Sequence, residues 1–326
     1  MNGRGEFLSR TALRFEGVFS VLATPFSPRD QIDEASLRRI VDRCIAAGVD
    51  GLTALGVTSE VGRLSEAERA AVRRAVLDQA GGRVPVVVGA TAEGRRQCIE
   101  ASRAAQQDGA AAVMISPPRL PKLHSDAVVG HYRAVAEAIE IPIVVQDYPP
   151  VSGFAMEPAL LVRIAREVPS VGAIKLEDPP TPLKTARILD AAGGAPIRIL
   201  GGLGGVYLLE ELLAGAAGAM TGFAFPEILV EVVRRFRAGA VDSAAELFYR
   251  YVALMRFEFQ EGIGLAIRKE VLRRRGALVH AAVRPPATTL DPGTGAALDR
   301  VLKHMQSQPD AIRFGVAADL APSARG

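Results

Sequence analysis

Short, continuous apolar segments alternate with longer segments of helical periodicity along most of the chain. The apolar segments are rich in Val, Ile, Leu and Ala, as expected of strands that are buried on both faces of a sheet. The segments between them repeat apolar residues every three or four positions, which predicts amphipathic helices. The eight predicted strands lie within residues 17–26, 48–56, 84–91, 109–118, 141–149, 171–178, 197–205 and 218–225.

Eight successive strand–helix units favour a parallel sheet that closes into an α/β TIM (β/α)8 barrel over residues 17–225. An open, doubly wound sheet is the alternative. It usually has fewer units and a glycine-rich phosphate-binding turn after its first strand. The segment ATPFSPRDQID, which follows the first predicted strand, has no such glycines. The barrel is therefore the predicted fold.

After residue 225 the pattern changes to three predicted helices with no strands between them, within residues 226–239, 241–260 and 262–276. They predict a C-terminal helical extension of the same domain over residues 226–283. Residues 1–16 form a predicted N-terminal arm. Residues 284–326 form a tail whose Pro, Gly and Ala content is compatible with partial disorder.

Composition narrows the class of protein. The 326 residues are 49% hydrophobic and carry a net charge of +3, and the basic residues are spread over most predicted helices, so no nucleic-acid partner is expected. The cluster Arg273–Arg275 lies at a predicted helix end, where cations complement the helix dipole; an anion-binding patch is the alternative. Two cysteines, Cys44 and Cys98, provide neither a disulfide framework nor a zinc site, and they fit a reducing cytoplasm. No export signal or membrane span is predicted.

In such a barrel the chemistry lies at the C-terminal ends of the strands, so polar residues there are the candidates. Lys175 interrupts the apolar strand VGAIKLED. Burial disfavours an ammonium group, and the free amine is the nucleophile that a Schiff base requires. A lysine that reaches water at the rim, or pairs with Glu177 or Asp178, is an equally good interpretation of its position alone. The strand ends supply as candidates Thr24, Gly56–Glu60, Ser116, Asp147, Tyr148, Lys175, Glu177, Asp178, Gly201, Gly202, Thr221 and Gly222.

Two further strand ends provide groups that suit this chemistry. A phenol at Tyr148 is able to move protons to and from an imine, although a tyrosine before two prolines is more often a packing residue. The segment GVTSE offers backbone N–H groups and the hydroxyls of Thr58 and Ser59 to a carboxylate. An ordinary turn with capping hydroxyls is its alternative.

Six segments together resemble the dihydrodipicolinate synthase and N-acetylneuraminate lyase family of pyruvate-dependent class I aldolases. The resemblance extends from about Gly17 to about Gly276, and its specificity lies in the order of the segments at the expected strands. The segments are GVFSVLATPF, ALGVTSEVGRLSEAER, DYPPVSG, GAIKLED, ILGG and GAAGAMTG.

The resemblance implies a cytoplasmic, homotetrameric TIM barrel that acts on a small 2-oxo acid. It assigns the Schiff-base lysine to Lys175, the catalytic tyrosine to Tyr148 and a carboxylate-binding hydroxyl to Thr58. It also places Gly202 and the backbone near Met220 and Thr221 at the substrate pocket. No metal or organic cofactor is implied, because the lysine imine itself is the electron sink.

Three departures from the synthases concern the substrate. Val57 stands at the first of the two threonine positions, and Arg119 and Leu120 stand where the synthases have a tyrosine pair, so both partners of their proton relay are missing. No arginine follows the tyrosine in YPPVSGF. An apolar side chain cannot replace a hydroxyl in a proton chain. Arg119 is a candidate either for binding a distal carboxylate or for a subunit interface.

Glu177 offers a replacement for the missing proton carriers. Side chains alternate along a strand, so Glu177 is predicted to share the interior face with Lys175. There it would suit a dehydratase or aldolase of 2-keto-3-deoxy acids, with an ion partner in the loop as the alternative. The sequence thus predicts a Schiff-base-forming lyase. The alternatives are a synthase of the lysine pathway and a barrel that binds a 2-oxo acid without turnover.

Overall fold

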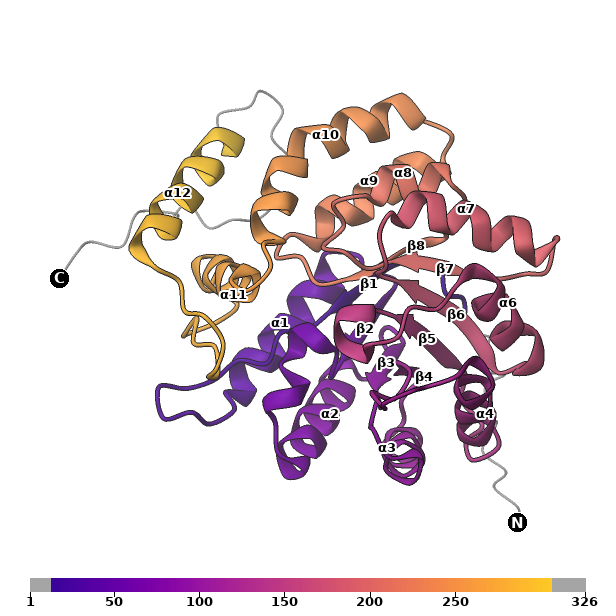
Figure 1. The fold of residues 1–326 in the computed structure, drawn as a ribbon. Helices are drawn as coiled ribbons and strands as arrows, with labels where there is room; N and C mark the ends of the chain where they lie inside the picture. The colour runs from indigo at the N-terminus through magenta and orange to yellow at the C-terminus, as the bar shows by residue number, and fades with distance from the viewer. Residues whose placement is uncertain (1–12, 307–326) are drawn as a thin grey trace, which may run out of the picture.

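The computed structural model describes residues 13–306 and contains a closed barrel of eight parallel strands, which lie side by side in sequence order (Figure 1). β1 also pairs with β8, so the sheet has no free edge. The TIM barrel prediction is confirmed. The strands are β1 Gly17–Val21, β2 Gly51–Ala54, β3 Val86–Gly89, β4 Ala112–Ile115, β5 Ile143–Asp147, β6 Val171–Leu176, β7 Ile199–Gly201 and β8 Gly218–Thr221.

Helices cover the outside of the barrel and follow the strands in turn (Figure 1). The start of α2 shows local capping chemistry: the Ser65 hydroxyl accepts from the backbone N–H of Glu68, whose carboxylate accepts from the N–H of Ser65. The helices are α1 Glu34–Ala46, α2 Glu66–Ala80, α3 Arg95–Gln107, α4 Ser125–Ala136, α5 Pro149–Ser152, α6 Pro158–Glu167, α7 Thr181–Ala192, α8 Leu208–Leu213 and α9 Pro226–Arg237.

Three more helices form the C-terminal extension: α10 Val241–Glu258, α11 Gly264–Arg274 and α12 Pro292–Gln306. α9 itself packs on β1 and completes the helical ring. α12 occupies part of the region for which only a tail is predicted from sequence. The apolar residues Leu298, Leu302 and Met305 share one buried face of α12, which contacts α10. The predicted arm before residue 13 and the tail beyond residue 306 lie outside the described residues.

The barrel interior and the layer between strands and helices form two separate apolar clusters. Alternate residues of each strand point into the interior, so that Ala173 lies in the inner cluster and its neighbour Ile174 in the outer one. The same alternation directs Lys175 and Glu177 inward. The inner cluster ends below Lys175, and polar side chains take over toward the C-terminal ends of the strands.

Glu211 on α8 is a buried carboxyl group outside the barrel interior. It is 2% exposed, accepts a hydrogen bond of 2.5 Å from the Thr181 hydroxyl, and has a pKa raised by burial from 4.5 to about 7. The folded protein therefore keeps this proton between about pH 4.5 and 7, whereas the unfolded chain releases it. Glu211 consequently lowers the stability as the pH rises through that window.

Removing this ionisation is expected to change the pH dependence of stability. Relative to the Glu211→Gln variant, the wild type should lose on the order of 3 kcal/mol of unfolding free energy between pH 4.5 and 7. Urea unfolding at several pH values measures the difference. Glu246→Gln, at an exposed glutamate of α10, is the control and should follow the wild type. Parallel pH curves for Glu211→Gln and the wild type would contradict the prediction.

Within residues 13–306, every helix is too short or too polar to cross a membrane. Both cysteines are buried free thiols. In the same part of the chain, no three His, Cys, Asp or Glu side chains are grouped so that they would hold a metal ion.

Candidate active site

A cavity of about 140 Å³ lies at the C-terminal ends of the strands, above the inner apolar cluster. It brings together side chains from β6, from the loops after β2, β5, β7 and β8, and from the α10–α11 junction. Among the residues predicted from sequence, those that line it are Val57, Thr58, Tyr148, Lys175, Glu177, Gly202, Thr221 and Gly222.

Lys175 is 3% exposed, and its Nζ lies 3.1 Å from Oε2 of Glu177. The backbone N–H of Glu177 still donates to the carbonyl of Asp147, so the pairing of β5 with β6 continues and keeps both side chains on the interior face. Each interpretation of Lys175 is met in part: the side chain is buried and does not reach water at the rim, and it pairs with Glu177 as the alternative predicts. Asp178, the other predicted partner, does not reach it.

A chain of buried polar side chains extends from this pair across the barrel. Gln146 Nε2 donates to Oε2 of Glu177 over 2.6 Å, and the Ser116 hydroxyl donates to Oε1 of Gln146 over 3.0 Å. Gln146 is not among the residues predicted from sequence. Its signal is its position two residues before Tyr148 in the apolar strand IVVQD, which places both on the interior face.

Tyr148 is half-buried at the end of β5 and lines the cavity. Burial raises the pKa of its phenol above 10, and the nearby carboxylates of Glu177 and Glu261 raise it further. The phenol therefore holds its proton at neutral pH and is available as a hydrogen-bond donor and acid.

The loop after β2 presents one hydroxyl to the cavity and uses the other for itself. The Thr58 hydroxyl is buried and has no partner within residues 13–306, although it lines the cavity. By contrast, the Ser59 hydroxyl donates to the carbonyl of Leu22 over 2.5 Å and accepts from the N–H of Gly56 over 3.1 Å. The structure therefore gives Ser59 a role in holding the turn, and Ser59 is not among the residues that line the cavity.

β7 and β8 contribute backbone and one hydroxyl. A Cβ on Gly202 would fall 2.1 Å from Cγ of Glu177, so glycine leaves the space that the Glu177 side chain fills. The Thr221 hydroxyl donates to the carbonyl of Gly202. Met220 belongs to the inner apolar cluster below the cavity and does not line it, because its side chain points into the packed interior.

Other strand-end candidates lie outside the cavity. Asp147 and Asp178 both accept from Lys184 Nζ, at 2.6 and 2.7 Å, on the helix side of the sheet. Burial raises the pKa of Asp147 to about 6. Arg119 is exposed and its stem lies near Gly153, so the structure leaves both of its predicted roles open.

The junction of α10 and α11 closes one side of the cavity, and sequence reasoning restricted to strand ends misses it. Arg268 and Glu258 are the buried charged members of this wall, and Arg268 Nε donates to Oε1 of Glu258 over 2.6 Å. The signal in the sequence is the run of polar residues and glycines between two predicted helices. The cavity-lining residues of the junction are Glu258, Phe259, Gln260, Glu261, Gly264, Leu265 and Arg268.

A buried ion pair holds the loop after β2 against α11. Lys269 Nζ donates to the Glu60 carboxylate and, over 2.8 Å, to the carbonyl of Ala282, and both charged side chains are fully buried. Glu60 itself adopts a left-handed conformation with φ of 60°. The pair therefore supports the turn that carries Thr58.

Removing one partner of this pair is expected to be costly. Lys269→Met removes the partner of one oxygen of the buried Glu60 carboxylate and leaves the half-buried Arg63, at 2.8 Å from the other oxygen, as its remaining cation. Chemical denaturation should therefore show a loss of about 3 kcal/mol in unfolding free energy, the low end of the cost of breaking a buried pair. The double variant Glu60→Gln with Lys269→Met should recover part of that loss. A double variant that is less stable than Lys269→Met alone would show that the pair is not the origin of the effect.

Comparisons with known proteins agree with this geometry. Residues 14–305 match the model of the dihydrodipicolinate synthetase family. An L-2-keto-3-deoxyarabonate dehydratase from Azospirillum brasilense is 34% identical over 303 residues, which cover 91% of this chain and 96% of that protein. A 4-hydroxy-tetrahydrodipicolinate synthase from Acidobacterium capsulatum is 32% identical over 87% of this chain and 94% of that protein.

A solved structure leads to the same family. The crystal structure of dihydrodipicolinate synthase from Rhodopseudomonas palustris matches with a TM-score of 0.83 and 36% identity, over 89% of this chain and 97% of that chain. The resemblance predicted from the six segments is confirmed. The chain belongs to the dihydrodipicolinate synthetase family and is a lyase of the class I aldolase type.

Proposed function

We propose that the protein forms a Schiff base between Lys175 and a 2-keto-3-deoxy acid and catalyses loss of water from it. The observation that carries the proposal is the buried Lys175 Nζ at 3.1 Å from the Glu177 carboxylate, in a small cavity that also contains the phenol of Tyr148. A buried amine with a carboxylate beside it has a nucleophile and a proton acceptor in one place.

The first stage is imine formation. The Lys175 amine adds to the C2 carbonyl carbon, and the carbonyl oxygen leaves as water with one proton from the amine and one from the Tyr148 phenol. The substrate carboxylate is positioned by the unpartnered Thr58 hydroxyl. Lys175 thereby supplies the electron sink that a cofactor would otherwise provide, so we propose that the reaction requires no metal or organic cofactor.

The second stage differs between dehydration and aldol cleavage. In dehydration, a base removes a proton from C3, and the resulting enamine expels the C4 hydroxyl, which accepts a proton and leaves as water. The unsaturated iminium then loses a proton from C5 and gains one at C3, the C4–C5 enol tautomerises to the aldehyde, and water hydrolyses the iminium to release the product and the Lys175 amine. In cleavage, the C4 hydroxyl loses its proton, the C3–C4 bond breaks and its electrons move to the iminium. Glu177 is the group we assign to the proton transfer at C3 or C4 because it lies beside Lys175 and is hydrogen-bonded in place by Gln146.

Dehydration is favoured over the synthase reaction by two observations. The Azospirillum brasilense relative, 34% identical over nearly the whole chain, is described as an L-2-keto-3-deoxyarabonate dehydratase. Val57 lines the cavity without a hydroxyl, and Leu120 is exposed and lies outside it, so neither continues a proton relay from Tyr148.

A substrate screen tests the proposal. The protein is incubated with L-2-keto-3-deoxyarabonate and related 2-keto-3-deoxy acids, and release of 2-oxoglutarate semialdehyde or of pyruvate is followed. Semialdehyde release supports dehydration, whereas pyruvate release would assign the protein to aldol cleavage. The second candidate, suggested by the 32% identical synthase, is checked by a coupled assay with pyruvate and aspartate semialdehyde. Turnover there at a normal synthase rate would overturn the dehydratase proposal.

The proposal extends to the assembly and the location of the protein. We infer a cytoplasmic homotetramer, supported by the family resemblance and by two buried free thiols that need no oxidising compartment. Sedimentation analysis of the purified protein tests the tetramer, and a monomer at micromolar concentration would contradict it.

A further inference from the structure

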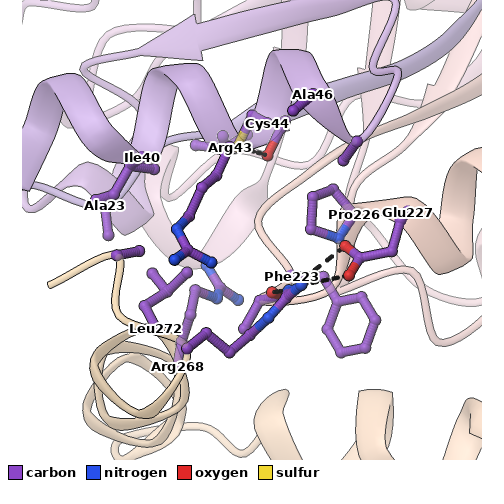
Figure 2. Close-up of a pocket in the computed structure, with 16 residues that line it drawn as sticks. Ala23, Ile40, Arg43, Cys44, Ala46, Phe223, Pro226, Glu227, Arg268 and Leu272 are labelled. Carbon is purple, nitrogen blue, oxygen red and sulfur yellow. Dashed lines mark hydrogen bonds and ion pairs between the residues drawn. The ribbon is translucent and has the colours of Figure 1, made fainter. Parts of the chain in front are cut away.

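A second cavity, of about 360 Å³, lies outside the barrel between α1, α11 and the loop that joins β8 to α9 (Figure 2). Its walls are mainly apolar: Ile40 and Ala46 line it from α1, Phe223 from the loop, Pro226 from the first turn of α9, and Leu272 from α11. This volume is more than twice that of the candidate active site, and its lining is less polar. Such a size and lining are typical of small-molecule sites.

The cavity also carries an excess of positive charge. Three arginines line it, and two of them have carboxylate partners: Arg275 pairs with Glu227, and Arg268 pairs with Glu258. The guanidinium group of Arg43 has neither a hydrogen bond nor an ion pair within residues 13–306. Figure 2 shows its side chain extending from α1 into the space between α1 and α11. The balance of three guanidinium groups against two carboxylates leaves one positive charge.

Arg43 is exposed to solvent on the outside of the molecule, and most of its charged neighbours are cations. Partial burial lowers the pKa of Arg43, and the neighbouring cations Arg275 and Arg39 lower it further, whereas Glu227 acts in the opposite direction. An anion in the cavity would relieve this repulsion.

Each of the two paired arginines has one buried nitrogen atom without a hydrogen-bond partner in the described part of the chain. Arg268 is 5% exposed, and its Nη1 is buried without a hydrogen-bond partner in the described part of the chain. The same holds for Nε of Arg275. Buried donors of this kind are normally satisfied, by protein or by a bound molecule.

We propose that this cavity binds an organic monocarboxylate with an apolar body, at a site separate from the one that holds Lys175. The apolar walls take the body of the ligand, and Arg43 pairs with its carboxylate. The proposal does not depend on the dehydratase assignment, because none of its observations involves Lys175 or Tyr148.

Calorimetric titration tests the proposal with octanoate and 3-phenylpropionate as probes, and with 1-octanol and 3-phenylpropanol as their uncharged counterparts. We expect saturable binding of one carboxylate per chain, about tenfold tighter than the matching alcohol. Shortening octanoate to hexanoate should weaken binding by roughly tenfold, because two methylene groups leave the apolar walls.

Variants locate the site. Arg43→Gln should weaken carboxylate binding about fivefold or more, whereas Arg74→Gln, at an exposed arginine of α2 that does not line the cavity, should leave it unchanged. Lys175→Ala should also bind the probes normally. Equal binding of acid and alcohol, normal binding by Arg43→Gln, loss of binding in Lys175→Ala, or no binding at millimolar concentration would each overturn the proposal. A failed substrate screen with normal probe binding would leave this site standing and remove only the proposed function.

Discussion

Lys175→Ala is expected to abolish pyruvate-dependent trapping by borohydride and to lower kcat at least about 10⁴-fold. Borohydride reduces an imine to a stable amine, so the wild type should gain the mass of one reduced pyruvyl group per chain. In the wild type, Lys175 is 3% exposed and lines the cavity of about 140 Å³ together with Thr58 and Tyr148. The variant has no amine at this position. Intact-protein mass spectrometry and peptide mapping measure the adduct.

The other buried lysines serve as internal controls. Lys184 donates to two carboxylates on the helix side of the sheet, and Lys269 is fully buried against Glu60, so neither amine meets the substrate cavity. Both should remain unmodified in the wild type. An adduct on either lysine, or trapping that survives in Lys175→Ala, would assign the imine to another residue. The absence of any adduct on the wild type would favour a barrel that binds 2-oxo acids without forming an imine.

Glu177→Gln is expected to separate imine formation from turnover. Glutamine preserves the shape of the side chain and a hydrogen bond with Gln146, but it takes up no proton at neutral pH. We therefore expect borohydride trapping with pyruvate to remain, and kcat with a 2-keto-3-deoxy acid to fall about 10²- to 10⁴-fold. Rapid-quench trapping and steady-state assays on the same preparation measure the two steps separately.

Asp178→Asn is the matched control. It removes a carboxylate one residue along the chain, but Asp178 points to the helix side and pairs there with Lys184. This variant should keep kcat within about threefold of the wild type, as expected for a group away from the chemistry. If Asp178→Asn lost turnover and Glu177→Gln kept it, the assignment of the proton transfer to Glu177 would be wrong.

The fold and the central pair of the site are predictable from the sequence because both depend on local pattern. Eight apolar segments separated by amphipathic ones determine the barrel, and strict alternation along β6 puts Lys175 and Glu177 on one face. The same rule, applied to β5, would have added Gln146. Its polar side chain occupies an interior position that a buried apolar residue would otherwise fill.

Other parts of the site depend on contacts between distant segments, which no local pattern contains. Ser59 looks like a ligand hydroxyl until its donor contact with the carbonyl of Leu22, 37 residues away, is known. The wall formed by the α10–α11 junction likewise cannot be predicted from the residues at the strand ends. Glu258 and Arg268 reach the cavity only because the C-terminal extension packs against the barrel. α12 was not predicted because its apolar face contains only three buried residues.

Arg268 lines both cavities, and its Nη1 lies 2.2 Å from the position that a Cβ on Gly222 would occupy, at the end of β8. One guanidinium group thus belongs to the wall of two compartments. A ligand that contacts the Arg268 guanidinium group in one cavity changes the free energy of binding in the other cavity. Thermodynamic linkage requires the two ligands to change each other's affinity by the same factor. The effect of a ligand in the outer cavity on the affinity for the 2-oxo acid, and the reverse effect, would then be two measurements of one coupling free energy.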